Sequence, residues 1–554
     1  MIFIYREGIL EDNKEKSSVA DAEFNKQLFK TYLALDNWHR FRLRLFIEGI
    51  LVGIAGGLAV GVFRFLLTKS EFLRLYGYEN IIWPAIKNVS LLPLFLWLCS
   101  LVFIAGALYK MCRVAPMASG SGIPQVKGVI LGLFKMDWLR ILWVKIVAGA
   151  AGIGAGLSLG REGPSIQIGA VAAQGLSRFM GRTRMEERYL ITAGAGAGLA
   201  AAFNAPVAGM MFALEELHRN FSGAVLLPTM AAAVSATIVS RLFFGSSTSF
   251  LFPSLVRLPS EYLVYVIFIA VTCGIGGIIF NYGLLHTDKF YGLPVFKNQS
   301  VKILFALLTA AVLGLCLPQV LGGGNTLVDT LAETRYSLGF ICLLLLGKYL
   351  FTLISYGCGV PGGFFLPLLV TGALMGSAEA CIFVSSGFLA DMYTPNIIII
   401  SMAAFFAASV RAPITGTLLI LEMTGDFDHL MALSLSSAVA YITAEFLKGS
   451  PIYDALLKKS LAVGNTPVLK EERNIMEVPV GSGSILENRT VEEIPRLPHT
   501  VLVNIKRQGE SMIPDPDIRL RQGDFLYFLT ESGNSEKVLR LGAEQVPKNH
   551  VRKL

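Results

Sequence analysis

The pentapeptide Gly160-Arg161-Glu162-Gly163-Pro164 carries two charges inside a long apolar region, and the rest of the chain is organised around it. A charged pair at membrane depth is costly and usually marks a function. Pro164 suits the first turn of a helix, whose free N–H groups and positive dipole end attract an anion. Glu162 is placed to occupy such an anion site itself. The pentapeptide alone also fits a simple loop between two spans, with Arg161 and Glu162 paired at the membrane interface.

The composition indicates an all-α membrane protein with many spans. The chain has 554 residues, of which 53% are hydrophobic and 16% charged, against about 25% charged in typical globular proteins. Its mean hydropathy is +0.58. Residues 44–447 contain about ten to twelve stretches that approach the length of a spanning helix. Several are short or interrupted by Gly and Pro, which is tolerated where the backbone is buried in protein or lines a water-filled cavity.

The charge pattern places the N-terminus in the cytoplasm, and we expect an integral protein of the bacterial inner or plasma membrane with both termini in the cytoplasm. Arg40, Arg42 and Arg44 stand just before the first apolar run, and positive flanks stay on the cytoplasmic side. The polar N-terminal stretch has no signal-peptide core. The net charge of +8 fits flanks near anionic lipid better than nucleic-acid binding, because no long basic stripe is present. The six histidines are scattered and give no metal-ligand spacing.

The chain divides into a membrane domain and a soluble domain. We expect a cytoplasmic tail over residues 1–43, a membrane domain over 44–458 with halves at about 44–220 and 251–450, a linker over 459–475, and a regulatory domain over 476–554.

The two membrane halves resemble each other in sequence. Ala205-Pro206 is followed by Leu214-Glu215, and Ala412-Pro413 is followed at the same offset by Leu421-Glu422, 207 residues later. Pro164 and Pro367, each followed by Gly-Ala at equal offset, lie 203 residues apart. Repeats with interrupted helices in matching positions predict a substrate site where the repeats meet. We expect the repeated carboxylates of Glu215 and Glu422 to be structural.

Three Gly/Pro motifs open apolar helices: Gly120–Pro124, Gly160–Pro164 and Gly363–Pro367. If these helix starts converge, their backbone N–H groups bind an anion without a fixed full charge, so that the anion can also leave. Ser121 adds a hydroxyl donor. Taken singly, each motif is more often a simple helix start.

With these motifs in this order, the chain resembles the CLC chloride channels and proton-coupled chloride transporters over residues 44–458. The run from Gly198 to Pro206 adds to the resemblance. It implies a homodimer in a lipid membrane, each subunit with its own anion pathway and two inverted repeats of tilted and broken helices. It implies no cofactor beyond the transported chloride and protons. The anion-binding residues of the family correspond here to Ser121, Gly122, Ile123, Phe364, Phe365 and Tyr453.

The resemblance assigns gating and proton transfer to two glutamates. Glu162 matches the family's external gating glutamate, whose carboxylate competes with chloride until it is protonated. Glu216 matches the position that passes protons to the cytoplasm in the transporters, where family channels usually carry an apolar residue. This favours a chloride/proton antiporter. Alternatively, Glu216 is a solvent-facing carboxylate at a helix end. Ser121 favours chloride, because nitrate exchangers of plants carry proline there and fluoride exporters alter the first two motifs.

Residues 476–554 predict a small α/β domain. Met476–Val480, Thr500–Lys506 and Asp524–Leu529 alternate like strands, and Thr490–Ile494 and Ser532–Leu541 resemble short helices. The pattern resembles the C-terminal regulatory subdomain of potassium-uptake proteins, the TrkA-C type. It predicts either a module that senses an unknown ligand or an appendage that stabilises a dimer.

Three other functions are weighed against the antiporter. The nearest is a passive voltage- or pH-gated chloride channel of the same fold, in which Glu216 is incidental. A cation system would need a carbonyl-lined filter such as TVGYG, which is absent from the sequence. An enzyme is not expected, because no nucleophile–base motif or metal spacing is found.

Overall fold

The computed structural model describes residues 18–250, 252, 255–462, 473–481, 484–495, 497–507, 510–531, 537, 538 and 541, and the side chains of these residues from Phe41 onward except 473–475 and 531. Residues 463–472, most of the predicted linker, and residues 1–17 of the predicted tail lie outside the described residues. Within the described part, eight helices are long and apolar enough to cross a membrane, and two further apolar helices are shorter.

The first half of the membrane domain begins with one continuous helix of 60 residues, which starts inside the predicted tail and continues through the first span. Its helices are α1 (Ser18–Gly77), α2 (Trp83–Lys87), α3 (Leu91–Val114), α4 (Ile123–Ile130), α5 (Trp138–Gly154), α6 (Glu162–Phe179), α7 (Arg184–Phe203), α8 (Pro206–Phe212) with its π-helical extension η4 (Ala213–His218), and α9 (Gly223–Phe244).

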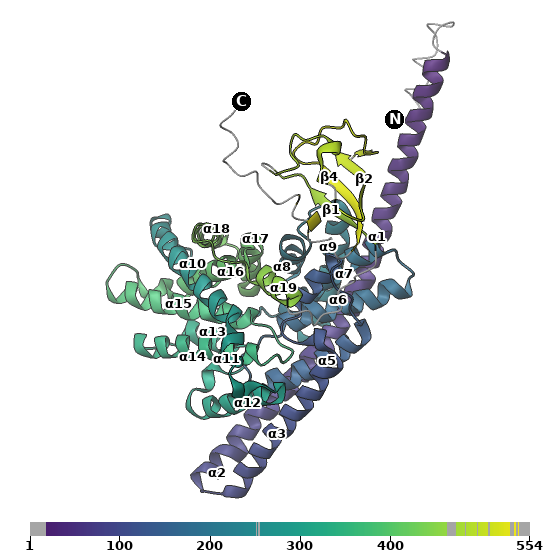
Figure 1. The fold of residues 1–554 in the computed structure, drawn as a ribbon. Coiled ribbons are helices and arrows are strands. Elements are labelled where there is room, and N and C mark those ends of the chain that lie inside the picture. Colours follow the sequence, from purple (N-terminus) through teal and green to yellow (C-terminus); the bar gives the residue numbers. More distant parts are fainter. Residues whose placement is uncertain are drawn as a thin grey trace.

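The second half repeats this order and packs beside the first half, in green beside blue in Figure 1. Its helices are α10 (Leu263–Leu285), α11 (Thr287–Tyr291), α12 (Gln299–Cys316), α13 (Asn325–Glu333), α14 (Leu338–Gly357), α15 (Phe365–Ser385), α16 (Thr394–Val410), α17 (Pro413–Thr424), α18 (Leu430–Phe446) and α19 (Ile452–Ala462). The core runs through both halves, and the span that ends in α16 is 94% buried inside the protein.

Short helices begin at matching places in the two halves because both sequences carry the same helix-start signals. Proline stands at the first or second position of α8 and of α17. The residues that end the preceding helices, Asn204 and Arg411, both adopt left-handed backbone, with φ of 63° and 71°. This conformation ends a helix and turns the chain sharply into the next one. The duplicated module expected from the sequence is therefore visible in the backbone.

The C-terminal domain is a four-stranded antiparallel sheet with a hydrophobic core of its own. Its strands are β1 (Arg473–Pro479), β2 (Thr500–Arg507), β3 (Glu510–Met512) and β4 (Phe525–Glu531), in the order β1-β4-β2-β3. The three predicted strands are confirmed, and β3 was missed because three residues are too few to show alternation. A short 3-10 helix, Val491–Glu493, lies within the predicted Thr490–Ile494 helix.

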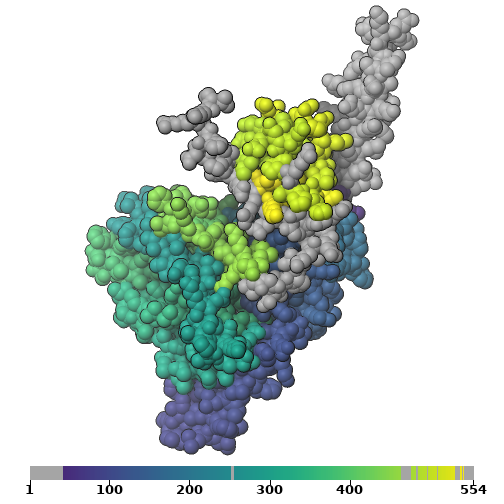
Figure 2. Space-filling model, in the orientation of Figure 1, coloured from purple at the N-terminus to yellow at the C-terminus, as the bar shows by residue number. Residues whose placement is uncertain are grey.

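The sheet forms a separate lobe at one end of the molecule, and the hairpin of α1, α2 and α3 reaches the opposite end (Figure 2). Helix α1 starts on the side that carries the sheet (Figure 1).

Candidate anion and proton pathway

The three predicted helix openings lie against one another at the centre of the membrane domain. The backbone of Gly160 pairs with that of Gly363 in both directions, with N···O distances of 2.5 and 2.9 Å. Gly362 N–H donates to the carbonyl of Gly120 at 3.0 Å, which joins the third opening to the same point. Segments that are some 40 and 200 residues apart in the sequence are thus tied together. Convergence of the three openings, as expected from the sequence, is observed.

Glycine is required at this junction because the backbones approach too closely for a side chain. A Cβ on Gly163 would lie 2.8 Å from the carbonyl oxygen of Ser121 and 3.1 Å from its Cα. Gly122 has a φ of 87°, in the left-handed region that favours glycine, and it precedes the first residue of α4. The helix starts can therefore lie within a few ångströms of a common point.

Glu162, the first residue of α6, is completely buried at this junction. The backbone N–H groups of Glu162 and Leu366 face its carboxylate, but neither carboxylate oxygen makes a hydrogen bond of normal geometry. A Cβ on Gly160 would lie 2.1 Å from Oε2 of Glu162, so the carboxylate packs against bare backbone. Its position beside helix N-termini is one that an anion could also occupy.

Three buried side chains and the partly buried Tyr356 continue from the junction toward α19. The hydroxyl of Tyr356 lies beside Ser121, which is 1% exposed. The ring of Tyr356 meets that of Phe364 edge-on at 5.1 Å, and Phe364 stacks on Tyr453 at 5.4 Å. The hydroxyl of Tyr453 is buried without a hydrogen-bond partner. Ser121, Phe364 and Tyr453, far apart in sequence, are therefore brought together.

The remaining predicted anion residues lie at the same helix starts. Phe365 begins α15, is 1% exposed and packs against Phe406 at 4.9 Å between ring centres. Ile123 begins α4, and its N–H donates to Oγ of Ser121 at 3.4 Å. In this conformation the Ile123 N–H is used within the protein rather than left free for an ion.

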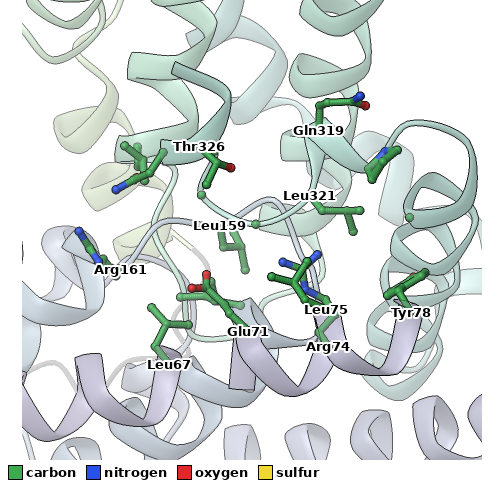
Figure 3. A pocket seen from close by; sticks show the side chains of 18 of the residues that line it. Leu67, Glu71, Arg74, Leu75, Tyr78, Leu159, Arg161, Gln319, Leu321 and Thr326 are labelled. Carbon is green, nitrogen blue, oxygen red and sulfur yellow. The ribbon is translucent and has the colours of Figure 1, made fainter. Parts of the chain in front are cut away.

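A cavity of about 450 Å³ is lined by Arg161, the sequence neighbour of Glu162, and by Leu159. Glu71 and Arg74 of α1 line it together with Arg161, and Figure 3 shows these side chains around the cavity. Leu366, whose N–H faces Glu162, also contributes to its wall. Nε of Arg161 is buried without a hydrogen-bond partner. Open space therefore reaches the immediate neighbours of Glu162.

Glu216 lies in η4 and is 1% exposed, so it is not the solvent-facing carboxylate of the alternative interpretation. Its Oε1 accepts a hydrogen bond from Nζ of Lys127 at 2.7 Å, and Arg219 lies 3.8 Å from Oε2. Asp454 of α19 completes the group, 2.5 Å from Lys127 and 2.7 Å from Arg219. We call these four residues the inner charged cluster. Lys127 and Asp454 were missed from the sequence, although a lysine within an apolar helix is itself a signal of function.

Two completely buried lysines hold the loops that precede α4 and α13. Nζ of Lys145 donates to the carbonyls of Ala118 and Gly120 at 2.8 and 2.7 Å. Nζ of Lys348 donates to Val320 and Gly322 at 3.0 and 2.7 Å. Both were missed from the sequence, although they lie 203 residues apart, the same separation as Pro164 and Pro367.

The repeated glutamates each bind the start of the other half's helix. Glu422 accepts from the N–H groups of Val207 and Ala208 at 3.1 and 2.7 Å. Glu215 accepts from Ile414 and Thr415 at 3.2 and 2.7 Å. The expected structural role at helix ends is confirmed, because each carboxylate caps two free N–H groups at a helix N-terminus.

Helix openings that converge on a buried carboxylate, within a bundle of apolar spans, define a membrane protein that conducts ions. The family model described as "Voltage gated chloride channel" matches residues 101–445, and a model described as "TrkA-C domain" matches residues 475–541. The H(+)/Cl(-) exchange transporter ClcA of Vibrio cholerae is 33% identical over 461 residues, which cover 79% of this chain and 94% of that protein. The chain belongs to the voltage-gated chloride channel (CLC) family.

Solved structures agree with this membership. The structure of a slow cyanobacterial Cl⁻/H⁺ antiporter is 32% identical, has a TM-score of 0.68 and covers 76% of this chain and 99% of its own. A CLC-type fluoride/proton antiporter has a TM-score of 0.61, is 21% identical and covers 74% of this chain and 97% of its own. The latter likeness bears on the fold only.

Proposed function

We propose that this chain exchanges chloride for protons across a membrane, the activity that the name of its Vibrio relative states for that protein. It is a transporter rather than an enzyme, and the exchange needs no cofactor. One observation carries the proposal: the buried carboxylate of Glu162 lies where three helix openings meet. A single titratable group at that point links the occupancy of the anion path to protonation.

Chloride binds in this proposal between the helix openings and the hydroxyls of Ser121 and Tyr453. The backbone N–H groups near Phe364 and Phe365 supply partial positive charge without a fixed cation, so the ion is held but can leave. The buried hydroxyl of Tyr453 has no acceptor within the described protein, and an anion beside it would supply one. Gly122 and Ile123 contribute the start of α4, whose N–H groups become available if Ile123 releases Ser121.

Glu162 acts as the gate and as the first proton carrier. As a carboxylate it occupies the outer part of the anion path and is attracted by the helix dipoles. Protonation removes its charge, and with it most of this attraction, so that the side chain can leave and chloride can take its place. The proton then passes toward Glu216, which is buried near the inner end of the path.

Replacement of Glu162 by glutamine tests the gate. We expect Glu162→Gln in liposomes to transport chloride without moving protons, because the amide keeps the shape of the side chain and loses its titration. Glu379→Gln is a matched control, since Glu379 is another membrane carboxyl, bonded to Thr272 of α10 and away from the helix openings. If Glu162→Gln still drives protons uphill in a chloride gradient, the assignment is wrong.

A passive channel is the second candidate function. Measurement of the reversal potential separates the two, because a channel follows the chloride gradient alone and an antiporter also responds to the pH gradient. The burial of Glu216 beside Lys127 favours the antiporter, since a buried charge needs a reason to be kept. The same liposomes, with chloride, nitrate and fluoride compared, test the preference for chloride that Ser121 predicts.

We also propose a homodimer in the bacterial inner membrane with both termini in the cytoplasm. The apolar side chains of Val207 and Ile414 are 42% and 49% exposed beside the reciprocal glutamate caps, and exposed apolar surface fits either a second copy or lipid. The start of α1 lies on the side of the sheet, as two cytoplasmic termini require (Figure 1). Light scattering in detergent tests the dimer, and protease digestion of oriented vesicles tests the termini.

The C-terminal domain is proposed to be a cytoplasmic module that senses a ligand or stabilises the dimer. A thermal-shift screen of the full chain against nucleotides, second messengers and anions separates these two roles. Stabilisation by one compound class supports sensing. Loss of the dimer on removal of the domain, with no shift in the screen, supports the stabilising role.

A further inference from the structure

The inner charged cluster contains two carboxylates that share one lysine. Nζ of Lys127 lies 2.7 Å from Oε1 of Glu216 and 2.5 Å from Oδ1 of Asp454. Arg219 contacts the other oxygen of Asp454 at 2.7 Å. The four side chains come from α4, from η4 and the residue that follows it, and from α19. Two negative and two positive charges make the cluster formally neutral, which allows a proton to be added at modest electrostatic cost.

The two carboxylates differ in their access to water. The side chains of Glu216 and Lys127 are 2% and 3% exposed, whereas that of Asp454 is 24% exposed. Glu216 therefore cannot exchange a proton directly with bulk water in this conformation. Asp454 is the carboxylate through which the cluster reaches solvent.

A cavity of about 400 Å³, between the membrane domain and the C-terminal sheet, is lined by three members of the cluster, Lys127, Arg219 and Asp454. Glu216 is not among its lining residues. Other titratable or charged groups also face it: Arg188 and Tyr189 of α7, His218 of η4, and Glu477 and Tyr527 of the sheet. The cavity has room for several water molecules, and the charged side chains in its wall offer them hydrogen-bond partners. Asp454 therefore faces a space that water can enter.

The resting state of Asp454 suits it to accept a proton from this water. Burial alone would raise the pKa of Asp454, but Lys127 and Arg219 together lower it below its usual value. The carboxylate therefore rests ionised, and a proton that it accepts is released again readily.

We propose that Asp454 is a proton-relay residue between the cytoplasmic water and Glu216, with Lys127 as the bridge between the two carboxylates. The step is balanced in protons. Asp454 takes a proton from hydronium in the cavity and leaves water, Lys127 gives one of its protons to Glu216, and Lys127 then regains a proton from Asp454. The lysine ends as it began, and the proton has moved from the cavity to the buried carboxylate. Transport in the other direction reverses each transfer.

This inference rests on the proposed role of Glu216, and the experiment separates the two. Glu216→Gln, Asp454→Asn and Asp454→Glu are reconstituted in liposomes, and chloride and proton fluxes are measured in each. We expect Asp454→Asn to lose about tenfold or more in proton flux, in line with the loss of a positioned acid–base group, and to keep chloride flux. Asp454→Glu restores proton flux because it returns a carboxylate.

Asp288→Asn is the matched control. Asp288 forms a 2.5 Å ion pair with Lys459 of the same helix α19, but it is 69% exposed and is not part of the cluster. If Asp454 merely anchors α19, both substitutions lower chloride and proton flux together. If it is a relay, only Asp454→Asn lowers the ratio of proton to chloride flux.

The fluxes of these variants separate the relay from the role of Glu216. Wild-type proton flux in Asp454→Asn, with coupling lost in Glu216→Gln, overturns the relay and leaves the proposed function standing. Wild-type coupling in Glu216→Gln overturns the role of Glu216 and the relay with it. If Asp454→Asn transports neither ion, Asp454→Glu decides, because glutamate titrates at higher pH than aspartate. The dependence of its proton flux on cytoplasmic pH must then shift upward, and an unchanged profile overturns the relay.

Discussion

Replacing Gly160 by alanine places a methyl group where the carboxylate of Glu162 lies. The new Cβ would be 2.1 Å from Oε2, whereas ordinary contacts begin near 3.4 Å, so the carboxylate must move by about 1.3 Å. Gly160 does not have a positive φ, and alanine therefore fits its backbone. The new Cβ would also lie 3.0 Å from the Cβ of Leu366, which must move by a few tenths of an ångström. The end of the flexible Glu162 side chain moves more easily than the backbone of α15.

The substitution should therefore weaken the closed position of the gate without removing its carboxylate. Overpacking in a well-packed core costs about 1–3 kcal/mol. If this cost falls on the closed position, the ratio of open to closed gates rises about 5- to 150-fold. We expect chloride flux in liposomes to rise and proton coupling to fall. Gly106→Ala is the control, because a Cβ there meets nothing within 4 Å.

A double-mutant comparison shows whether the effect acts through Glu162. In a Glu162→Ala background the obstruction is gone, so Gly160→Ala should change chloride flux little. An equal effect in both backgrounds would mean that the methyl group acts on the backbone and not on the gate. Wild-type coupling in Gly160→Ala would refute the position assigned to the carboxylate.

Two further predictions concern buried charges outside the gate. Lys145→Met should lower the free energy of unfolding of the full chain by about 2–5 kcal/mol, because it leaves the carbonyls of Ala118 and Gly120 without their charged donor. Thermal unfolding in detergent measures this loss. An unchanged unfolding midpoint would contradict the prediction. In the C-terminal domain, burial would raise the pKa of Asp524, but its hydrogen bonds from Arg507 outweigh this and lower it. A lowered pKa stabilises the domain above the unfolded value of about 3.9 and loses this contribution as pH falls through the folded value. Protease resistance of the domain in the full chain should therefore fall toward acid pH in the wild type, whereas Asp524→Asn should be less resistant at pH 7 and show a weaker acid dependence.

The sequence was sufficient for the features that local chemistry dictates. Pro and Gly mark helix starts regardless of tertiary context, so the openings at Ser121, Glu162 and Phe365 were placed correctly along the chain. The alternation of apolar and polar residues was likewise enough to predict the three longer strands of the sheet. The equal spacing of repeated motifs predicted the two halves, because a duplicated fold keeps its separations.

What could not be predicted depends on contacts between distant segments. Lys127 was inconspicuous because its partners, Glu216 and Asp454, are 89 and 327 positions away. Lys145 and Lys348 bind backbone carbonyls, and such contacts leave no trace in a sequence. Their separation of 203 residues, equal to that of Pro164 and Pro367, is the one sequence signal that marks both as a repeated pair.

The reciprocal glutamate caps bear on how such a chain can be made and how it can arise. The start of α8 is capped by Glu422, which leaves the ribosome some two hundred residues later, so the first half is synthesised with bare amides at that helix. A first half on its own would have no carboxylate to cap the start of α8, unless a second half supplied one. Two identical halves related by a two-fold axis would each give the carboxylate that the other needs. The present chain keeps that exchange within one polypeptide.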